Sequence, residues 1–233
     1  MYKHLLWDVD GTVLDFNSAE KYAMKTLFAK YNLGEIGDEK ISLYSKINTK
    51  YWQMLERGEL SKSEVLIGRF IEFFEITGVD TSIAERFNLD YQVTLGDHIE
   101  FIDNAKEILL SVKGKYVISA VTNGTKRAQQ KKLYMSGLDK IFDAIFISED
   151  IGFEKPNRQY FEIVFDNLVI KDKSEVLIIG DSLSSDMKGG YDMGIDTCWF
   201  NPSKKVNSLN IPVTYEIDNL SKIYHIIGGE NNV

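Results

Sequence analysis

Short continuous apolar runs alternate with helical stretches along much of the chain. Runs of this length without polar alternation suit strands that are covered on both faces, as in a parallel sheet. Later in the chain the predicted strands and helices alternate, which indicates right-handed crossovers between parallel strands. We therefore expect an α/β fold with a Rossmann-like parallel sheet. The predicted strands lie at residues 3–9, 116–121, 143–147, 175–179 and 196–200.

A long helical stretch without a convincing strand follows the first predicted strand. Ser61 with Glu64, and Asn17 with Glu20, resemble capping boxes at helix starts. The stretch reads as an all-helical cap inserted into the α/β core. A closing cap would exclude bulk water from the chemistry and supply contacts to the substrate. The expected division is a core of residues 1–15 and 96–233 and a cap of residues 16–95.

Two carboxylates stand directly behind the first predicted strand. Asp8 and Asp10 follow the apolar run Leu5-Leu6-Trp7. Like charges at this separation repel, and burial raises the cost of ionising either of them. A divalent cation and a role in chemistry are the usual compensation. The alternative for this stretch is a tight turn, because Asp10-Gly11 is a strong turn signal.

Polar residues also follow two further predicted strands. Thr122 and Asn123 come directly after the second apolar run, and Asp181 follows the fourth run, with Asp186 five residues on. In an open α/β sheet, ligand-binding groups gather beyond the carboxyl ends of the strands, so we expect these residues at one edge. Lys155 adds a cation that would offset negative charge and hold a phosphoryl oxygen. The alternative for a lone lysine is a solvated surface charge.

Four motifs in this order resemble the signature of the haloacid dehalogenase-like hydrolase superfamily. They are Asp8-x-Asp10-Gly11-Thr12, Thr122-Asn123-Gly124, Lys155-Pro156-Asn157, and Gly180-Asp181 with Ser185-Asp186. Their order and spacing match over nearly the whole chain. Scattered positions also resemble a subgroup of pyrimidine 5′-nucleotidases that act on non-standard nucleoside monophosphates. These are Asn48 and Trp52, Glu56-Arg57-Gly58, Arg69-Phe70, Ile147-Ser148-Glu149, Gly189-Gly190 and Thr197-Cys198-Trp199.

The resemblance implies a Mg²⁺-dependent phosphomonoesterase. Asp8 is the expected nucleophile, because a carboxylate forms an aspartyl-phosphate and so divides one difficult displacement into two easier ones. Asp8 and Asp181 would supply carboxylate oxygens to the metal, which prefers hard oxygen ligands. The resemblance implies that Asp10 contributes its backbone carbonyl to the metal, which leaves its side chain for acid–base catalysis.

The remaining motif residues are expected to bind the phosphoryl group. Thr122 would offer its hydroxyl, Asn123 its amide or backbone N–H, and Lys155 its positive charge. Asp186 is expected to orient Lys155 or a metal-bound water from behind. The alternative for Asp186 is a helix N-terminal acid that the helix dipole favours.

The expected substrate is a nucleoside 5′-monophosphate, and the subgroup resemblance implies a pyrimidine base. Tyr44, Asn48, Tyr51 and Trp52 share one helical face. Aromatic rings stack on a base, and Asn48 would hydrogen-bond a base edge or the ribose. The alternative is that this face packs the core of the cap itself.

Two other functions stay open at this point. One is a sugar-phosphate or phosphoglycolate-type phosphatase, or a phosphomutase, on the same scaffold. The other is a phospho-aspartate signalling or binding protein without turnover. The helical insertion and the early position of Asp8 disfavour a signalling receiver, and steady release of inorganic phosphate would exclude both proteins without turnover.

The composition of the chain limits the cellular compartment and the classes of binding partner that we expect. The 233 residues carry a net charge of −8, which disfavours binding to a nucleic-acid polymer because its backbone requires clustered Lys and Arg. Cys198 is the only cysteine, so no internal disulfide is possible, which fits a reducing compartment. No apolar run approaches the length of a membrane span. We expect a cytoplasmic protein that acts on a small phosphorylated metabolite, without a membrane or an obligate protein partner.

Overall fold

The computed structural model describes residues 1–228 and divides into two compact units. The first unit contains Met1–Asp15, Glu100–Lys126 and the chain from Ser136 onward. The second unit contains Phe16–Ile99 and Arg127–Met135. Residues 127–135 group with the helical segment in this division. The core and cap boundaries given above stay a prediction.

The first unit is built on a sheet of six parallel strands in the order β3-β2-β1-β4-β5-β6. The strands are β1 (His4–Trp7), β2 (Val117–Thr122), β3 (Ala144–Ile147), β4 (Val176–Gly180), β5 (Asp196–Phe200) and β6 (Tyr215–Ile217). The first five confirm the strands predicted from apolar runs. Every residue of β4 is buried, as expected for a strand covered on both faces. The edge strand β6 has no counterpart among the predicted strands.

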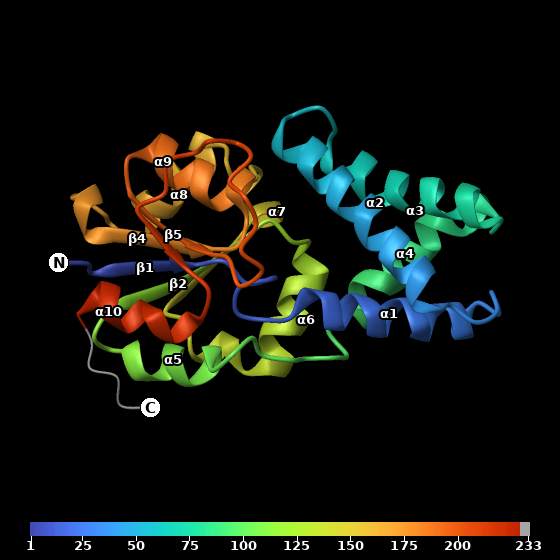
Figure 1. Ribbon diagram of the computed structural model, residues 1–233, viewed down its shortest axis with the longest axis horizontal. Helices are drawn as coiled ribbons and strands as arrows, with labels where there is room; N and C mark the ends of the chain where they lie inside the picture. Colours follow the sequence, from blue (N-terminus) through green and yellow to red (C-terminus); the bar gives the residue numbers. More distant parts are fainter. Residues whose placement is uncertain (229–233) are drawn as a thin grey trace. The chain divides into compact units, whose positions relative to one another are not determined.

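Helices cover both faces of this sheet. Figure 1 shows α8 and α9 on one side of the strands and α5 and α10 on the other. The α-helices of this unit are α5 (Ala105–Val112), α7 (Ser148–Ile151), α8 (Arg158–Asn167), α9 (Lys188–Met193) and α10 (Ile223–Ile227), while α6 (Lys126–Ser136) lies mostly in the second unit. The short helical turns are η2 (Leu138–Lys140), η3 (Lys173–Glu175), η4 (Leu183–Met187) and η5 (Leu220–Lys222).

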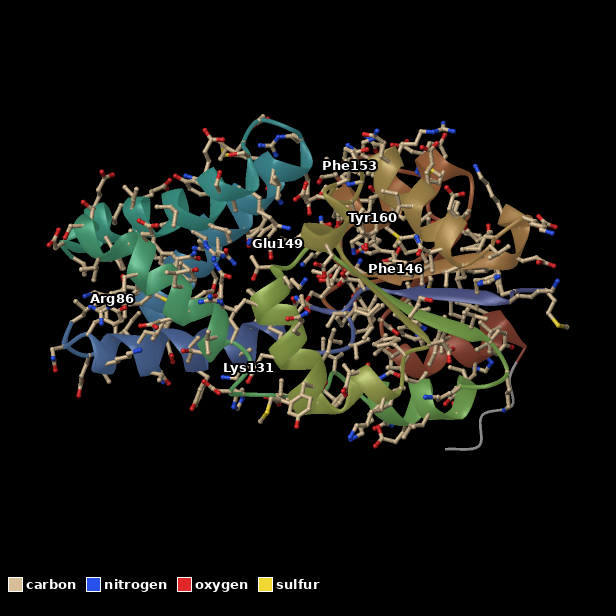
Figure 2. The ribbon with its side chains drawn as sticks, turned by 180° about the vertical axis from the view of Figure 1, so that it is seen from behind. Arg86, Lys131, Phe146, Glu149, Phe153 and Tyr160 are labelled. Carbon is tan, nitrogen blue, oxygen red and sulfur yellow. The ribbon has the colours of Figure 1, made fainter. Side chains whose placement is uncertain are left out.

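The apolar residues of α8 pack on the sheet next to β1 and β4. Tyr160 and Phe161 are fully buried together with Leu6 and Ile178 in one hydrophobic cluster. The hydroxyl of Tyr160 donates to the backbone carbonyl of Phe146 at 2.8 Å, and Figure 2 shows both residues. The buried hydroxyl is therefore satisfied, and the packing supports the strand that carries Asp8.

The second unit is helical throughout its first segment, as predicted. Its elements are α1 (Phe16–Lys30), α2 (Asp38–Glu56), α3 (Lys62–Thr77), η1 (Thr81–Ile83) and α4 (Ala84–Thr94). Ser61 and Glu64 form the predicted capping box at the start of α3. The capping box predicted at Asn17 and Glu20 is wrong, because α1 begins at Phe16 and Glu20 is buried inside the unit.

No helix among residues 1–228 is long and apolar enough to cross a membrane. The thiol of Cys198 is buried in β5, as its apolar neighbours indicated. The cytoplasmic location stays a prediction.

Candidate active site

The carboxyl ends of β1, β2 and β4 bring the motif residues to one edge of the sheet. Trp7, the last residue of β1, pairs with Ala120 of β2 and Ile179 of β4. Asp8 leaves the sheet between the ends of these two strands, and its backbone N–H donates to the carbonyl of Ile179 at 2.9 Å. Parallel strands that end together place the residues that follow them side by side.

Lys155 lies at the centre of the site and is 1% exposed. The alternative prediction, that Lys155 is a solvated charge on the protein surface, is therefore wrong. Its ammonium donates to Asp8 Oδ1 at 2.8 Å, to Asp186 Oδ1 at 2.6 Å and to the carbonyl of Val121 at 2.7 Å. An ammonium has three N–H donors and no acceptor, so these bonds use every donor. In this arrangement Lys155 compensates buried negative charge and donates no hydrogen bond to a further ligand.

The side chain of Asn123 fixes the backbone at Lys155. Its Oδ1 accepts from the N–H of Lys155 at 2.7 Å, and its Nδ2 donates to the carbonyl of Lys155 at 2.8 Å. Of the two donors predicted for Asn123, the side-chain amide is therefore engaged in positioning Lys155. Thr122 is buried beside it, and its Oγ1 accepts from the N–H of Gly124 at 3.2 Å, which leaves the hydroxyl proton to be donated elsewhere.

Three carboxylates gather beside Lys155; those of Asp8 and Asp186 are buried and that of Asp181 is half-buried. Asp8, Asp181 and Asp186 each offer one oxygen, and these oxygens all lie within 4.8 Å of one another. Gly11 and Gly180 make this approach possible. A Cβ at Gly11 would meet Asp181 Oδ2 at 2.8 Å, and a Cβ at Gly180 would collide with the carboxylate of Asp186. Asp186 was predicted to orient Lys155 or a metal-bound water from behind, and the structure also brings it among the possible metal ligands.

Burial makes these carboxylates costly to ionise. It raises the pKa of Asp8 and of Asp181 to about 7 and the pKa of Asp186 to about 6, while the Lys155 ammonium opposes the rise in each case. Burial alone would lower the pKa of Lys155, but the charges of Asp186 and Asp8 outweigh it and raise that pKa above its usual range. A further cation among the carboxylates would relieve their repulsion.

Asp10 lies in the turn that follows β1. The backbone of Gly11 has a φ of +89°, which a glycine adopts without steric cost, and its N–H donates to the carbonyl of Leu14 at 2.9 Å. The charge of Asp10 is close enough to Asp8 to raise the pKa of Asp8 further. The turn and the carboxylate cluster therefore coexist, although the side chain of Asp10 is not among the three gathered carboxylates.

The two predicted substrate residues, Asn48 and Trp52, lie on α2 of the helical unit. Asn48 is buried; its Nδ2 donates to Glu20 Oε2 at 3.1 Å, and Arg69 Nη1 donates to its Oδ1 at 2.7 Å. Trp52 is half-buried, and Tyr44 on the same helix is fully buried. The face of α2 therefore packs the helical core at Tyr44 and Asn48. A substrate role for Asn48 and Trp52 stays a prediction.

Glu20 and Arg69 are buried and both hydrogen-bond Asn48. Arg69 is one of the positions that resemble the nucleotidase subgroup, whereas Glu20 was predicted only as part of a helix cap. Arg69 Nη2 also donates to Asn88 Oδ1 at 3.0 Å, and the guanidinium carbon lies 5.0 Å from the ring centroid of Phe70. Burial raises the pKa of Glu20. Glu20 interrupts an otherwise apolar face of α1, and that interruption by a charge is the signal that could have indicated its buried position.

Comparison with known proteins identifies the family. Residues 5–200 match the family described as haloacid dehalogenase-like hydrolase. YfnB of Bacillus subtilis, named as a HAD-hydrolase, is 39% identical over 234 residues, which cover 100% of this chain and 98% of that protein. The pyrimidine 5′-nucleotidase PynA of Streptococcus pneumoniae is 34% identical over 220 residues, which cover 93% of this chain and 91% of that protein. The pyrimidine 5′-nucleotidase YjjG of Escherichia coli is 26% identical over 223 residues, which cover 96% of each chain.

Solved structures share the fold. A crystal structure of YfnB from Bacillus subtilis bound to magnesium has a TM-score of 0.91 at 37% identity and covers 100% of this chain and 99% of that chain. A dehalogenase with a TM-score of 0.75 at 18% identity, covering 98% of each chain, shares the fold alone. The motifs that resembled this family meet at one site, and the family match spans most of the sequence. The chain belongs to the haloacid dehalogenase-like hydrolase family and is a phosphohydrolase of that family.

Proposed function

We propose that this phosphohydrolase cleaves pyrimidine nucleoside 5′-monophosphates with the help of Mg²⁺ and through a phosphorylated Asp8. The observation that carries the proposal is the buried ion pair of Asp8 and Lys155 beside two further carboxylates. This group offers a nucleophile, hard oxygen ligands and a fixed cation. Transfer of a phosphoryl dianion requires these three parts.

Asp8 and Asp10 divide the covalent chemistry between them. A carboxylate oxygen of Asp8 forms a bond to phosphorus while the bond from phosphorus to the nucleoside oxygen breaks. Asp10 gives a proton to that leaving oxygen. Asp10 then takes a proton from a water molecule, which attacks phosphorus, releases inorganic phosphate and restores Asp8.

The phosphoryl oxygens would be held by groups that surround Asp8. The hydroxyl of Thr122 and the backbone N–H of Asn123 are the proposed donors. Lys155 acts through its charge, because its three N–H groups already bind Asp8, Asp186 and Val121. A charge fixed in a buried site stabilises a developing anion without further reorganisation.

The carboxylate cluster fits a magnesium ion. Three side-chain oxygens lie within 4.8 Å of one another, and Mg²⁺ prefers hard oxygen ligands. Asp8, Asp181 and Asp186 would hold the ion, with the backbone carbonyl of Asp10 as a further proposed ligand. The bound ion would neutralise carboxylate charge and polarise a phosphoryl oxygen. The magnesium in the YfnB crystal structure supports this assignment.

The cluster also predicts how stability depends on pH and Mg²⁺. The pKa values near 7 for Asp8 and Asp181 and near 6 for Asp186 exceed the usual value of about 4 for an unfolded chain, so the native state binds these protons more tightly. Their contribution to stability is complete below about pH 4 and is lost as the pH rises through about 7. We expect the Tm measured in chelator to fall from pH 5 to pH 8, and Mg²⁺ to raise it most at pH 8.

Asp181→Asn provides the control for this pH dependence, because it removes one acid of the cluster and nearly conserves the volume of the side chain. It should flatten the fall in Tm and weaken the effect of Mg²⁺. A chelated wild-type protein whose Tm rises with pH in this range would contradict the electrostatic account of the cluster.

The nucleotide specificity rests on the relatives and on the helical unit. Two relatives at 34% and 26% identity are named pyrimidine 5′-nucleotidases. The helical unit carries Trp52, a half-buried residue, on α2. An aromatic ring stacks on any base, so we assign pyrimidine preference to hydrogen-bonding groups of that unit rather than to the ring.

A phosphate-release screen with Mg²⁺ tests the substrate. We expect thymidine and uridine monophosphates to exceed glucose 6-phosphate and phosphoglycolate in kcat/KM, with Trp52→Ala lowering kcat/KM for nucleotides and sparing a small aromatic-free ester. Relatives at 25% and 23% identity are named N-acylneuraminate-9-phosphatase and glyceraldehyde 3-phosphate phosphatase, so sugar phosphates belong in the screen. A preference for these sugar phosphates would refute the nucleotidase proposal and leave the phosphohydrolase assignment intact.

A further inference from the structure

The loop of residues 122–126 connects the end of β2 to the start of α6. Its first two residues, Thr122 and Asn123, carry the proposed phosphoryl donors, and its last residue, Lys126, begins α6. Lys155 has donated all three of its N–H groups to protein oxygens, so it gives no hydrogen bond to an arriving phosphate. The alignment of the loop backbone therefore decides how well the proposed donors meet the phosphoryl oxygens.

The carboxylate of Glu149 holds the last residue of this loop. The backbone N–H of Lys126 donates to Glu149 Oε2, and Figure 2 shows Glu149 beside the start of α6. The first N–H groups of a helix have no acceptor within the helix, and the helix dipole favours a carboxylate at this end. Glu149 is therefore a helix cap supplied by another element, and it fixes the backbone of Lys126.

The segment that supplies this cap also holds the beginning of the loop. Thr122 pairs with Ile147, and α7 begins directly after Ile147, so Glu149 stands next to the loop that follows β2. Further along the same segment, the backbone of Lys155 makes two hydrogen bonds to the side chain of Asn123, at 2.7 and 2.8 Å. Residues 149–155 thus hold the loop near both of its ends and carry Lys155 as well.

Asp150, the residue after Glu149, contacts the side chain of Lys126 and not its backbone. Lys126 Nζ lies 2.6 Å from Asp150 Oδ1, and both side chains are about half exposed. An exposed ion pair of this kind contributes little to stability and does not constrain the backbone. Glu149 and Asp150 are therefore neighbouring exposed acids with one partner residue, and only the contact of Glu149 fixes the loop backbone.

We propose that Glu149 is a positioning residue for phosphoryl transfer, which aligns the backbone of residues 122–126 by capping Lys126. The aligned loop directs the N–H of Asn123 and the hydroxyl of Thr122 to the phosphoryl oxygens. The role rests on the proposed phosphomonoesterase function. Because Glu149 acts through the loop on the phosphoryl group, its effect should be the same for every phosphate ester, whatever the leaving group.

The test compares Glu149→Ala with Glu149→Gln and Asp150→Asn. Alanine removes the acceptor for the N–H of Lys126, and we expect kcat/KM to fall roughly tenfold, because small displacements of positioned groups are costly. The factor should be equal for uridine monophosphate and for a small phosphate ester. Glu149→Gln keeps an acceptor oxygen and should restore most of the activity. Asp150→Asn loses only an exposed ion pair and should stay within about twofold of wild type.

Asp80→Ala separates positioning from a general loss of stability. Asp80 is an exposed carboxylate that caps η1, where its Oδ1 accepts from the N–H of Ser82 at 2.9 Å. Loss of a helix cap lowers the Tm of a chain of this size by roughly 2–4 °C. Both Asp80→Ala and Glu149→Ala should show this shift, and only Glu149→Ala should lose activity at 25 °C. Equal losses of kcat/KM in the two variants would overturn the positioning role.

Binding of inorganic phosphate to the Mg²⁺-loaded protein, measured by calorimetry, gives a readout that does not depend on turnover. Glu149→Ala should raise the Kd for phosphate roughly fivefold, and Glu149→Gln should restore it, because misaligned donors bind an anion less tightly. An unchanged Kd and kcat/KM in Glu149→Ala would overturn the role of Glu149 and leave the proposed function intact. If wild type hydrolyses no pyrimidine nucleoside monophosphate but Glu149→Ala alone weakens phosphate binding, the proposed function fails and the role of Glu149 stands.

Discussion

Asp8→Asn is expected to abolish phosphate release and leave the fold intact. The substitution removes the attacking charge, and loss of a covalent nucleophile lowers turnover by roughly 10⁴-fold or more. The amide oxygen of asparagine still accepts the hydrogen bond that Lys155 now donates at 2.8 Å. One of three gathered acids becomes neutral, so the Tm measured in chelator should equal or exceed that of wild type.

The matched control is Asp166→Asn, which makes the same chemical change at an exposed position of α8. It should keep full activity. Near wild-type phosphate release from purified Asp8→Asn would refute the nucleophile assignment. Mass spectrometry of a peptide that contains residue 8, after rapid quenching with substrate, should detect the added phosphate in wild type and not in the variant.

Lys155→Met is expected to have a large effect on both turnover and stability. Lys155 and the two carboxylates that it binds are buried, so its removal leaves uncompensated negative charge inside the protein. Removing one partner of such a pair costs about 3–5 kcal/mol, which corresponds to a fall in Tm of roughly 10 °C for a chain of this size. Turnover should fall at least about a hundredfold, because a fixed charge that stabilises the transferred phosphoryl group is lost.

The double variant Lys155→Met with Asp186→Asn separates the two effects. It removes one of the stranded charges, so it should regain part of the lost Tm, and the recovery measures the coupling between the two residues. Activity should not recover, because the cation is still absent. A Lys155→Met variant with an unchanged Tm would contradict the buried ion pair, and one with normal turnover would contradict its role in phosphoryl transfer.

The parallel sheet was predictable because each of its longer strands is marked by a continuous run of apolar residues in the sequence. Continuous apolar runs such as Val176–Gly180 occur when a strand is covered on both faces, and five of the six strands carry this signal. The edge of the sheet that holds the active site was also predictable. Ligand-binding groups of an open α/β sheet lie beyond the carboxyl ends of its strands, and the polar residues after each apolar run stand at those ends. The capping box at Ser61 was predictable because a cap depends on residues only three positions apart.

What the sequence left undecided depends on contacts between distant residues. β6 has three residues, which is too short for a periodic signal, and it exists because β5 provides a partner. The side-chain amide of Asn123 was one of two donors expected for the substrate, but it holds Lys155 from 32 residues away in sequence, and the backbone N–H remains the proposed donor. Glu20 has the spacing of a capping residue and is buried instead against Asn48, a contact that no local pattern encodes.

The central position of β1 has a consequence for how the enzyme is made. The strands that pair with β1 lie far along the chain from it and begin at Val117 and Val176. At usual rates of synthesis the ribosome needs on the order of ten seconds to reach the second partner, so the strand leading to Asp8 emerges long before it can pair. During that time its apolar run has two open edges, which favours capture by chaperones or by other chains. Asp8, the proposed nucleophile, is thus synthesised long before the strands that fix its position, and contacts this distant in sequence form slowly.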